Sequence, residues 1–258
     1  MTNFPTIFIS HGGPDLPLYD SPARDFLSHL GETLGTPKGI LVISAHWCTP
    51  EPMVSLATQP QTIYDFSGFP PELYKLQYPA PGAVELADRA IALLNQAGIP
   101  SHTHPSRGLD HGAWNPLLLM YPEANIPVTQ LSVQPRRDAA YHLAIGKALS
   151  PLKEEGFLIL ASGAATHNMQ DFGKYDFHAT PPSYVQEFQE WLSKALLTGA
   201  EEDLLNYAET APYGTKNHPT SEHFLPLFVA LGAGDMTSAT QLHSSYTYGV
   251  FSMAAYSF

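Results

Sequence analysis

The chain has 258 residues, with 24 acidic side chains against 12 lysines and arginines, 12 histidines and one cysteine. A net charge of −12 disfavours nucleic acid and anionic membranes as partners, because both attract basic proteins. One cysteine cannot form an internal disulfide, the first residues form no cationic leader, and no apolar run has the length that a bilayer requires. We therefore expect a cytoplasmic protein, a monomer or small homo-oligomer, that binds small molecules.

Short apolar segments typical of buried strands alternate along the chain with segments of helical periodicity. In chain order, the pattern predicts a strand at Thr6–Ser10, a helix at Pro22–Gly31 capped by Ser21, a strand at Ile40–Ser44, a helix at Gly82–Ala97, a strand at Val128–Val133, a helix at Asp138–Leu149, a strand at Phe157–Ala161, helices at Ser183–Leu197 and Ser221–Leu231, and a closing strand at Tyr246–Tyr256. Proline and glycine are spread evenly, so no linker or repeat divides residues 1–258. The alternation predicts a single α/β domain with a central, mostly parallel (mixed) sheet flanked by helices on both faces.

Three histidines follow predicted strands. His11 comes directly after the first strand, His46 follows the second, and His167 lies beyond the strand that ends at Ala161. Because the carboxyl ends of parallel strands share the sheet edge where ligands bind, these histidines can converge. A lone histidine near a turn is usually structural, but three at that edge favour a first-row divalent metal such as Zn(II) or Fe(II).

The remaining candidates for chemistry divide into two groups. His111 lies within Asp110–Trp114, and His223 lies at the start of a predicted helix, so both are further candidates for the site. The other histidines are expected to be solvated or structural: His29, His142, His178 and His243, with His102 and His104 on a surface turn and His218 outside the helix of His223. Cys48 is expected to be a small buried hydrophobe, and Ser162 lacks the preceding glycine of a serine-hydrolase elbow.

Several motifs occur together along nearly the whole chain: His11–Pro14, Ser44–Trp47, Ile63–Pro70, Tyr78–Gly82, Asp110–Trp114, Ala161–Asn168 and Glu222–Pro226. With these motifs in this order, the chain resembles the class III extradiol ring-cleavage dioxygenases, and within them the single-chain 4,5-DOPA extradiol dioxygenase group. The resemblance implies a non-haem Fe(II) enzyme that uses O2 to open the ring of a catechol, DOPA or a related substituted catechol. It also implies that Zn(II) can occupy the resting site.

The resemblance also implies roles for single residues. His11 and His46 correspond to metal ligands, and His223 corresponds to the third ligand. His167 corresponds to a histidine that acts as acid and base or joins the coordination sphere, and His111 corresponds to a second catalytic histidine in the pocket. A neutral imidazole with an ordinary pKa near 6.5 suits proton transfer at neutral pH.

One departure from the family concerns the third ligand. Protocatechuate-type members use a glutamate there, and in this chain Glu222 lies next to His223. We expect His223 to take the role, as in the DOPA-type group. Aromatic side chains are expected to wall the substrate pocket, with Tyr64, Phe69 and Trp114 as substrate-binding residues and two further wall candidates, Trp47 and Phe66.

Two other functions fit the same residues. A zinc-dependent hydrolase could use a histidine site to activate water, and dependence of turnover on O2 would separate it from a dioxygenase. A non-catalytic ligand-binding or adapter protein of the Memo type is similar to this superfamily, and the fold alone does not exclude it. Five intact histidine positions argue against a decayed site.

Overall fold

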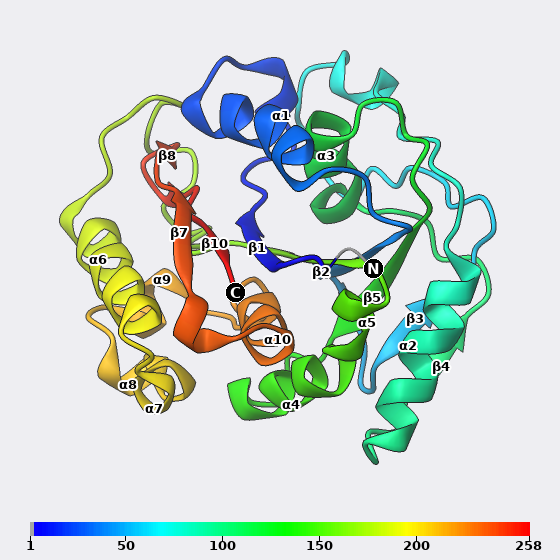
Figure 1. Ribbon diagram of the computed structural model, residues 1–258. Helices are drawn as coiled ribbons and strands as arrows, with labels where there is room; N and C mark the ends of the chain where they lie inside the picture. Colours follow the sequence, from blue (N-terminus) through cyan, green and yellow to red (C-terminus); the bar gives the residue numbers. More distant parts are fainter. Residues whose placement is uncertain (1–2) are drawn as a thin grey trace.

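The computed structural model describes residues 3–258 as a central eight-stranded sheet between two layers of helices (Figure 1). The strands lie in the order β4-β3-β5-β2-β6-β1-β10-β7. Their bounds are β1 Thr6–Ser10, β2 Ile40–Cys48, β3 Met53–Ser55, β4 His102–His104, β5 Val128–Val133, β6 Leu158–Gly163, β7 Thr240–His243 and β10 Ala255–Ser257. Two short strands, β8 (Tyr246–Thr247) and β9 (Phe251–Ser252), form a separate antiparallel pair.

The middle of the sheet is parallel and its margins are mixed. β5, β2, β6 and β1 run in one direction, while β10 pairs antiparallel with β1 and β7, and β3 pairs antiparallel with β5. Every residue of β1, β5 and β6 is buried, as expected for strands covered on both faces. The predicted fold class, an α/β domain with a mostly parallel mixed sheet, is confirmed.

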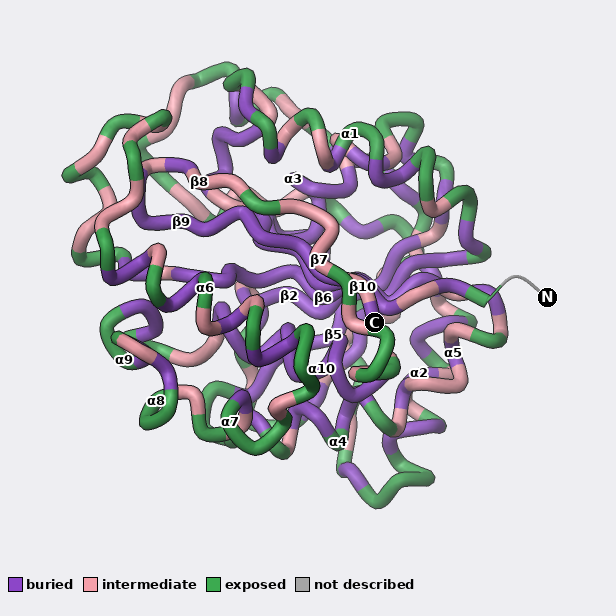
Figure 2. Tube along the Cα trace, turned by 60° about the vertical axis from the view of Figure 1, so that its left-hand side comes forward, coloured by how far each residue is buried: buried purple, intermediate pink, exposed green. Residues whose placement is uncertain are grey.

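Helices cover both faces of this sheet. The α-helices are α1 Pro22–Leu34, α2 Val84–Gln96, α3 His111–Met120, α4 Ala139–Leu149, α5 Pro151–Glu154, α6 Ser183–Leu197, α7 Glu201–Leu205, α8 Tyr207–Thr210, α9 Gly214–Asn217 and α10 Leu225–Ala233. Three short 3₁₀ helices are η1 Leu16–Leu18, η2 Leu73–Lys75 and η3 Met236–Ser238. Helices α1 and α3 pack on one face, and α2, α4, α6 and α10 pack on the other (Figures 1 and 2). No helix among residues 3–258 is long and apolar enough to cross a membrane.

Alternate residues of the central strands supply the two halves of the core. Ile40 and Val42 of β2 pack with α1 and α3, while Leu41 and Ile43 pack with α4 and α10. The period of two along a strand sends these neighbours to opposite faces. Helix α10 is buried along its whole length, which agrees with its wholly apolar sequence. The central strands of the sheet are therefore enclosed between the two layers of helices.

Two expectations about the elements are corrected by the structure, and helix α3 is an addition to them. The predicted closing strand at Tyr246–Tyr256 is wrong, because Tyr248 and Gly249 adopt positive φ values of 53° and 64° and turn the chain between β8 and β9. Helix α10 begins at Leu225, so His223 lies in the turn before it. Helix α3 was not predicted, because its uniformly apolar sequence and internal Pro116 hide the helical period.

Two close contacts at glycines, one with backbone and one with a side chain, position the end of β6 and the start of α3 at the carboxyl edge. A Cβ on Gly163 would lie 2.2 Å from the carbonyl oxygen of His223, and the neighbouring amide of Ala164 donates to that same oxygen at 2.8 Å. A Cβ on Gly112 would lie 2.5 Å from the hydroxyl of Ser44. The fold thus brings His223 against β6 and the residues around His111 against β2.

Gly163→Ala is expected to lower the free energy of unfolding by about 1–3 kcal/mol, because the new methyl group meets backbone that cannot yield. Urea denaturation at pH 7 measures the change. Gly39→Ala is the matched control, since its Cβ would lie 3.3 Å from its nearest neighbour. Equal effects of the two substitutions would show that Gly163 has no special packing role.

Candidate metal centre

Three imidazoles meet at the carboxyl edge of the sheet. His11 follows β1, His46 lies near the end of β2, and His223 lies in the turn before α10. The Nε2 atom of His46 lies 3.1 Å from Nε2 of His11 and 3.1 Å from Nε2 of His223. His11 and His223 are buried, and His46 is partly exposed. Residues 212 positions apart in the chain thus present the same ring atom to one point.

The other ring nitrogen of each histidine has its own partner. Nδ1 of His11 lies 3.0 Å from the hydroxyl of Ser162, and that hydroxyl donates its proton to the carbonyl of Gly112. Ser162 therefore accepts a hydrogen bond from Nδ1–H of His11. Nδ1 of His223 donates to the Glu222 carboxylate at 3.1 Å, and Nδ1 of His46 lies 3.2 Å from a carboxylate oxygen of Asp65. In all three rings the proton belongs on Nδ1.

Protons on Nδ1 leave a bare lone pair on each Nε2 atom. Two such lone pairs at 3.1 Å repel one another and cannot form a hydrogen bond. A shared cation removes this repulsion. Two imidazole nitrogens bound at about 2.1 Å to one metal, at roughly right angles, lie about 3 Å apart. The residues present therefore fit a divalent metal ion.

Burial also keeps these rings neutral, as metal ligands must be. Burial lowers the pKa of His11 and of His223 well below the ordinary value, and it lowers the pKa of His46 to about 4. The neighbouring imidazoles add to the lowering for each ring. The chain thus presents three neutral donors at neutral pH, and metal binding needs no proton to be displaced from Nε2.

Two more histidines stand beside this group. The ring of His167 stacks on His223 with centroids 3.5 Å apart, and burial lowers the pKa of His167 to about 3. The ring of His111 lies 3.8 Å from that of His46, centroid to centroid. The structure therefore gathers all five predicted site histidines.

A carboxylate that the sequence analysis did not assign connects two of them. One oxygen of Asp65 accepts hydrogen bonds from the backbone amide and Nδ1 of His111, at 3.0 and 2.9 Å, and its other oxygen faces His46. Burial raises the pKa of Asp65, but the hydrogen bonds from His111 and the electrostatic attraction of the His111 and His46 rings outweigh it, and the pKa falls to about 2. Asp65 is thus ionised and orients both rings. The sequence feature that could have pointed to Asp65 is its position as the one acidic residue in the aromatic segment Ile63–Pro70.

Asp110, directly before His111, anchors the start of α3. Its buried carboxylate accepts hydrogen bonds from Ser44 at 2.6 Å, from Gln130 at 2.8 Å and from Arg107 at 2.9 Å. Each carboxylate oxygen therefore has a partner, which a buried charge requires. These bonds tie the element that carries His111 to β2 and β5.

The histidines form the base of a cavity of about 310 Å³. Aromatic side chains that line it are Phe66, Phe69, Phe172 and Phe251. Tyr64 and Trp114, expected to bind substrate, do not line it: Trp114 is fully buried, and its ring lies 6.3 Å from that of Phe66. Trp47 does not line it either. Phe69 is thus the one expected substrate-binding residue that this cavity contains.

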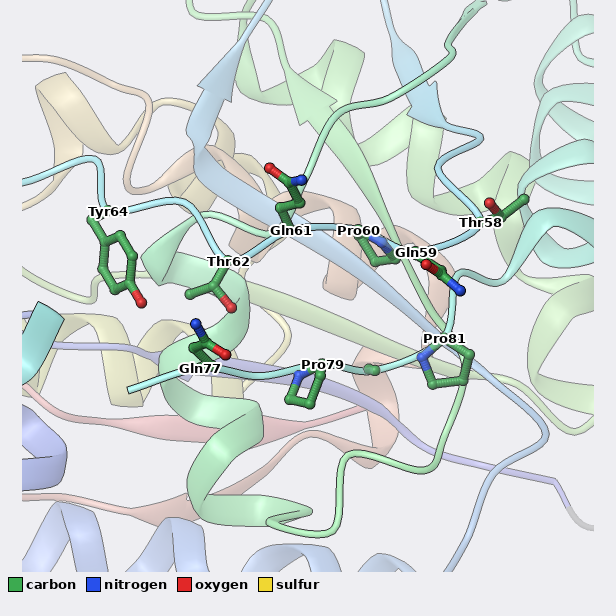
Figure 3. A pocket seen from close by; sticks show the side chains of 10 residues that line it. Thr58, Gln59, Pro60, Gln61, Thr62, Tyr64, Gln77, Pro79 and Pro81 are labelled. Carbon is green, nitrogen blue, oxygen red and sulfur yellow. The ribbon is translucent and has the colours of Figure 1, made fainter. Parts of the chain in front are cut away.

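A larger cavity of about 730 Å³ lies apart from the histidines (Figure 3). It runs between the segments 58–64 and 77–81, and polar amides and prolines line it. It shares no lining residue with the histidine cavity and holds no histidine or carboxylate. The volume of a cavity alone therefore does not identify the reactive site here.

The remaining histidines and the cysteine lie outside the centre. His142 and His218 are buried and hydrogen-bonded to backbone groups, so they are structural. His102 and His104 form the edge strand β4, not a surface turn. The expectation that Cys48 is buried is wrong: its residue is exposed at the end of β2, because that strand runs four residues beyond the predicted end.

Comparison with known proteins agrees with this geometry. The family model "Catalytic LigB subunit of aromatic ring-opening dioxygenase" matches residues 1–258. The protein "4,5-DOPA dioxygenase extradiol" of Beta vulgaris is 46% identical over 98% of this chain and 96% of its own length. The protein of the same name in Escherichia coli (strain K12) is 40% identical over 91% of this chain and 86% of its own length.

The fold has a solved counterpart as well. The crystal structure of uncharacterized protein JW3007 from Escherichia coli K12 matches with a TM-score of 0.81 and 33% identity, over 99% of both chains. The chain belongs to the LigB family of aromatic ring-opening dioxygenases. The resemblance found in the sequence motifs is confirmed, and the chain is an enzyme of the dioxygenase class.

Asp65→Asn is expected to weaken metal binding about 10–100-fold, because the asparagine amide would set its own N–H groups against a ring N–H. Competition with a chromogenic chelator measures the dissociation constant. Asp176→Asn, which removes the same charge from an exposed residue, is the control. Unchanged affinity in Asp65→Asn would rule out a role of Asp65 in holding the rings.

The stability of the metal-free protein is expected to fall as the pH falls from about 6.5 to 4. Burial lowers the pKa of His142 and of His218 to about 4, so the unfolded chain binds protons in this window that the folded chain excludes. Each such group contributes about 1.4 kcal/mol per pH unit. Urea denaturation in EDTA should show a shallower pH slope for His218→Gln than for the native chain. His178→Gln, at an exposed residue, should leave the slope unchanged, and equal slopes for all three proteins would contradict the assignment.

Proposed function

We propose that His11, His46 and His223 bind Fe(II) and that the enzyme opens the ring of a catechol, DOPA or a related substituted catechol, with O2. The observation that carries the proposal is the set of three unprotonated Nε2 atoms aimed at one point beside an aromatic-walled cavity. Held by these three histidines, Fe(II) would offer its remaining coordination positions to both catechol oxygens and to O2. Zn(II) fits the same donors and is expected to compete for the site.

His167 is proposed as the acid and base of the reaction. Burial lowers its pKa, so the ring is unprotonated and ready to accept a proton from a catechol hydroxyl at neutral pH. It lines the cavity beside His223 but lies outside the group of three Nε2 atoms that meet at His46. That position lets it take a proton from substrate and return it to the product.

His111 is proposed as the second catalytic histidine. Its Nδ1–H is held by Asp65, so its Nε2 atom is a hydrogen-bond acceptor, and the ring lines the cavity. His111 can thus accept a hydrogen bond or a proton from a substrate oxygen.

The third ligand is proposed to be His223 and not Glu222. Glu222 accepts the hydrogen bond of Nδ1–H of His223, on the side of the ring away from the Nε2 group. It also accepts a hydrogen bond from Thr220 at 2.9 Å. Glu222 is therefore better suited to orienting His223 than to binding the metal. A second grouping of His167, Glu222 and His223 is close enough to hold an ion and is the alternative ligand set.

The other two functions are less well supported. Membership of a family of catalytic subunits argues against a Memo-type adapter. A zinc hydrolase would need no O2, so oxygen consumption separates it from the proposed reaction. We also propose that residues 1–258 act as one catalytic domain, in the cytoplasm, as a monomer or small homo-oligomer.

His46→Ala is expected to lose both metal and turnover, since it removes the Nε2 atom that the other two ligands approach. His167→Ala is expected to keep metal and to lose turnover by about 10²–10⁴-fold, the usual contribution of acid–base catalysis. Anaerobic loading with Fe(II), metal analysis, and oxygen uptake with 4-methylcatechol measure both properties. His178→Ala, at an exposed residue, is the control. Full activity of His46→Ala would contradict the ligand assignment. Absence of oxygen uptake by the iron-loaded native enzyme with every catechol tried would contradict the proposed function.

A further inference from the structure

We infer that Asp15 is a specificity-determining residue of this enzyme and that its carboxylate binds an ammonium group on the side chain of the catechol. The inference rests on the proposed function and concerns a residue outside the five histidines and Asp65. Asp15 follows Pro14 in the segment after β1, four positions beyond the proposed metal ligand His11. The lining residues Gly13 and Pro14 come directly before it, so the chain places a carboxylate beside the cavity of the histidines.

The carboxylate of Asp15 is buried and incompletely bonded. The residue is 2% exposed. Its Oδ2 atom accepts a hydrogen bond from the hydroxyl of Tyr248, but its Oδ1 atom has no hydrogen-bond partner among residues 3–258. Buried polar groups in folded proteins nearly always have partners, so this oxygen indicates a donor that the chain itself does not supply. A cationic donor suits it best, because it brings both the hydrogen bond and the counter-charge.

The local structure does not account for this carboxylate. Asp15 occupies the N-cap position of the 3₁₀ helix η1, where an aspartate usually accepts a hydrogen bond from a backbone amide, but its side chain makes no such bond. Burial raises the pKa of Asp15 more than the hydrogen bond from Tyr248 lowers it. The buried charge therefore destabilises the free protein, and groups that cost stability in this way are typical of functional sites.

Residues that line the cavity also contact Asp15 and its partner. A Cβ on Gly13 would lie 2.6 Å from Oδ1 of Asp15, so this oxygen lies against a lining residue that has no side chain to cover it. The ring of Tyr248 packs on that of Phe172, another lining residue, with centroids 5.1 Å apart. Asn115 donates to the carbonyl oxygen of Gly13 at 3.2 Å and fixes this segment. Asp15 and Tyr248 thus form a polar pair at the cavity wall.

The distance from the metal ligands suits an ammonium group on a short side chain. Gly13 lies two positions beyond His11, so their α-carbons are at most about 7 Å apart, which a catechol ring with a short side chain can span. Asp65, the carboxylate that lines the cavity, already faces two histidine rings, so Asp15 is the carboxylate left to meet a cation. A charge-assisted hydrogen bond at this position favours the aminated catechol by about tenfold or more.

Two pairs of catechols, each differing in one ammonium group, test the inference. Dopamine is compared with 4-propylcatechol, in which a methyl group replaces the ammonium group, and L-DOPA is compared with 3-(3,4-dihydroxyphenyl)propionate, in which a hydrogen replaces it. Oxygen uptake gives kcat/KM of the Fe(II)-loaded enzyme, and anaerobic calorimetry gives the dissociation constants of the Zn(II)-loaded protein. Both measures are expected to favour the aminated member of each pair by about tenfold or more.

The two measures separate failure of the inference from failure of the proposed function. Equal or weaker use of the aminated members overturns the role of Asp15 and leaves the ring-opening reaction intact. Absence of turnover with all four catechols overturns the reaction, and the dissociation constants of the Zn(II)-loaded protein then decide the role of Asp15.

Asp15→Asn removes the charge and keeps an oxygen for the hydroxyl of Tyr248. It is expected to lower the preference for the aminated member of each pair by about tenfold in both measures. Gly13→Ala keeps the carboxylate but sets a methyl group against Oδ1, and it is expected to lower the same preference. Asp88→Asn, at an exposed residue of α2, is the control for net charge. An unchanged preference in Asp15→Asn, an equal fall in Asp88→Asn, or an equal loss for both members of each pair would overturn the inference.

Discussion

The repulsion between three Nε2 lone pairs is the constraint on which the rest of this site depends. Ser162, Asp65 and Glu222 each hold one ring by its Nδ1 atom, so the three Nε2 atoms have no proton with which to bond to each other. Protonation of an Nε2 atom would relieve the repulsion, but burial lowers the pKa of these rings and keeps them unprotonated. A divalent cation bound to all three Nε2 atoms removes the repulsion. The repulsion destabilises the metal-free protein, so its relief adds to the free energy of metal binding.

The fold supplies this arrangement from distant parts of the chain. Parallel strands β1, β2 and β6 end at one edge, and two close contacts, at Gly112 and Gly163, bring the start of α3 and the turn before α10 to the same place. Gly163 meets the backbone of His223, and Gly112 meets the hydroxyl of Ser44, which a hydrogen bond to Asp110 holds in place. The centre is therefore as rigid as the sheet that carries it, which a site of preorganised ligands requires.

The sequence predicts the central strands and the long helices because each carries a clear period or a capping residue. It also predicts that His11, His46 and His167 converge, because a general rule places the ends of parallel strands together. His111 and His223 could be placed only by resemblance, since neither directly follows a predicted strand. The roles of Asp65 and Ser162 were not predicted, because each depends on a contact with a distant residue. Asp65 contacts His111, 46 positions along the chain, and Ser162 contacts His11, 151 positions away. Trp114 is buried in the core and does not line the cavity, and this placement depends on tertiary packing that the sequence pattern does not reveal.

The most direct test of the central claim is the position of the metal in crystals loaded anaerobically with Fe(II), located by anomalous scattering at the iron edge. The account predicts one strong peak within bonding distance of the Nε2 atoms of His11, His46 and His223. Coordination by Glu222 in place of His223 would contradict it. So would a peak in the neighbouring group of His46, Asp65 and His111, because Asp65 would then be a ligand and would not orient the rings.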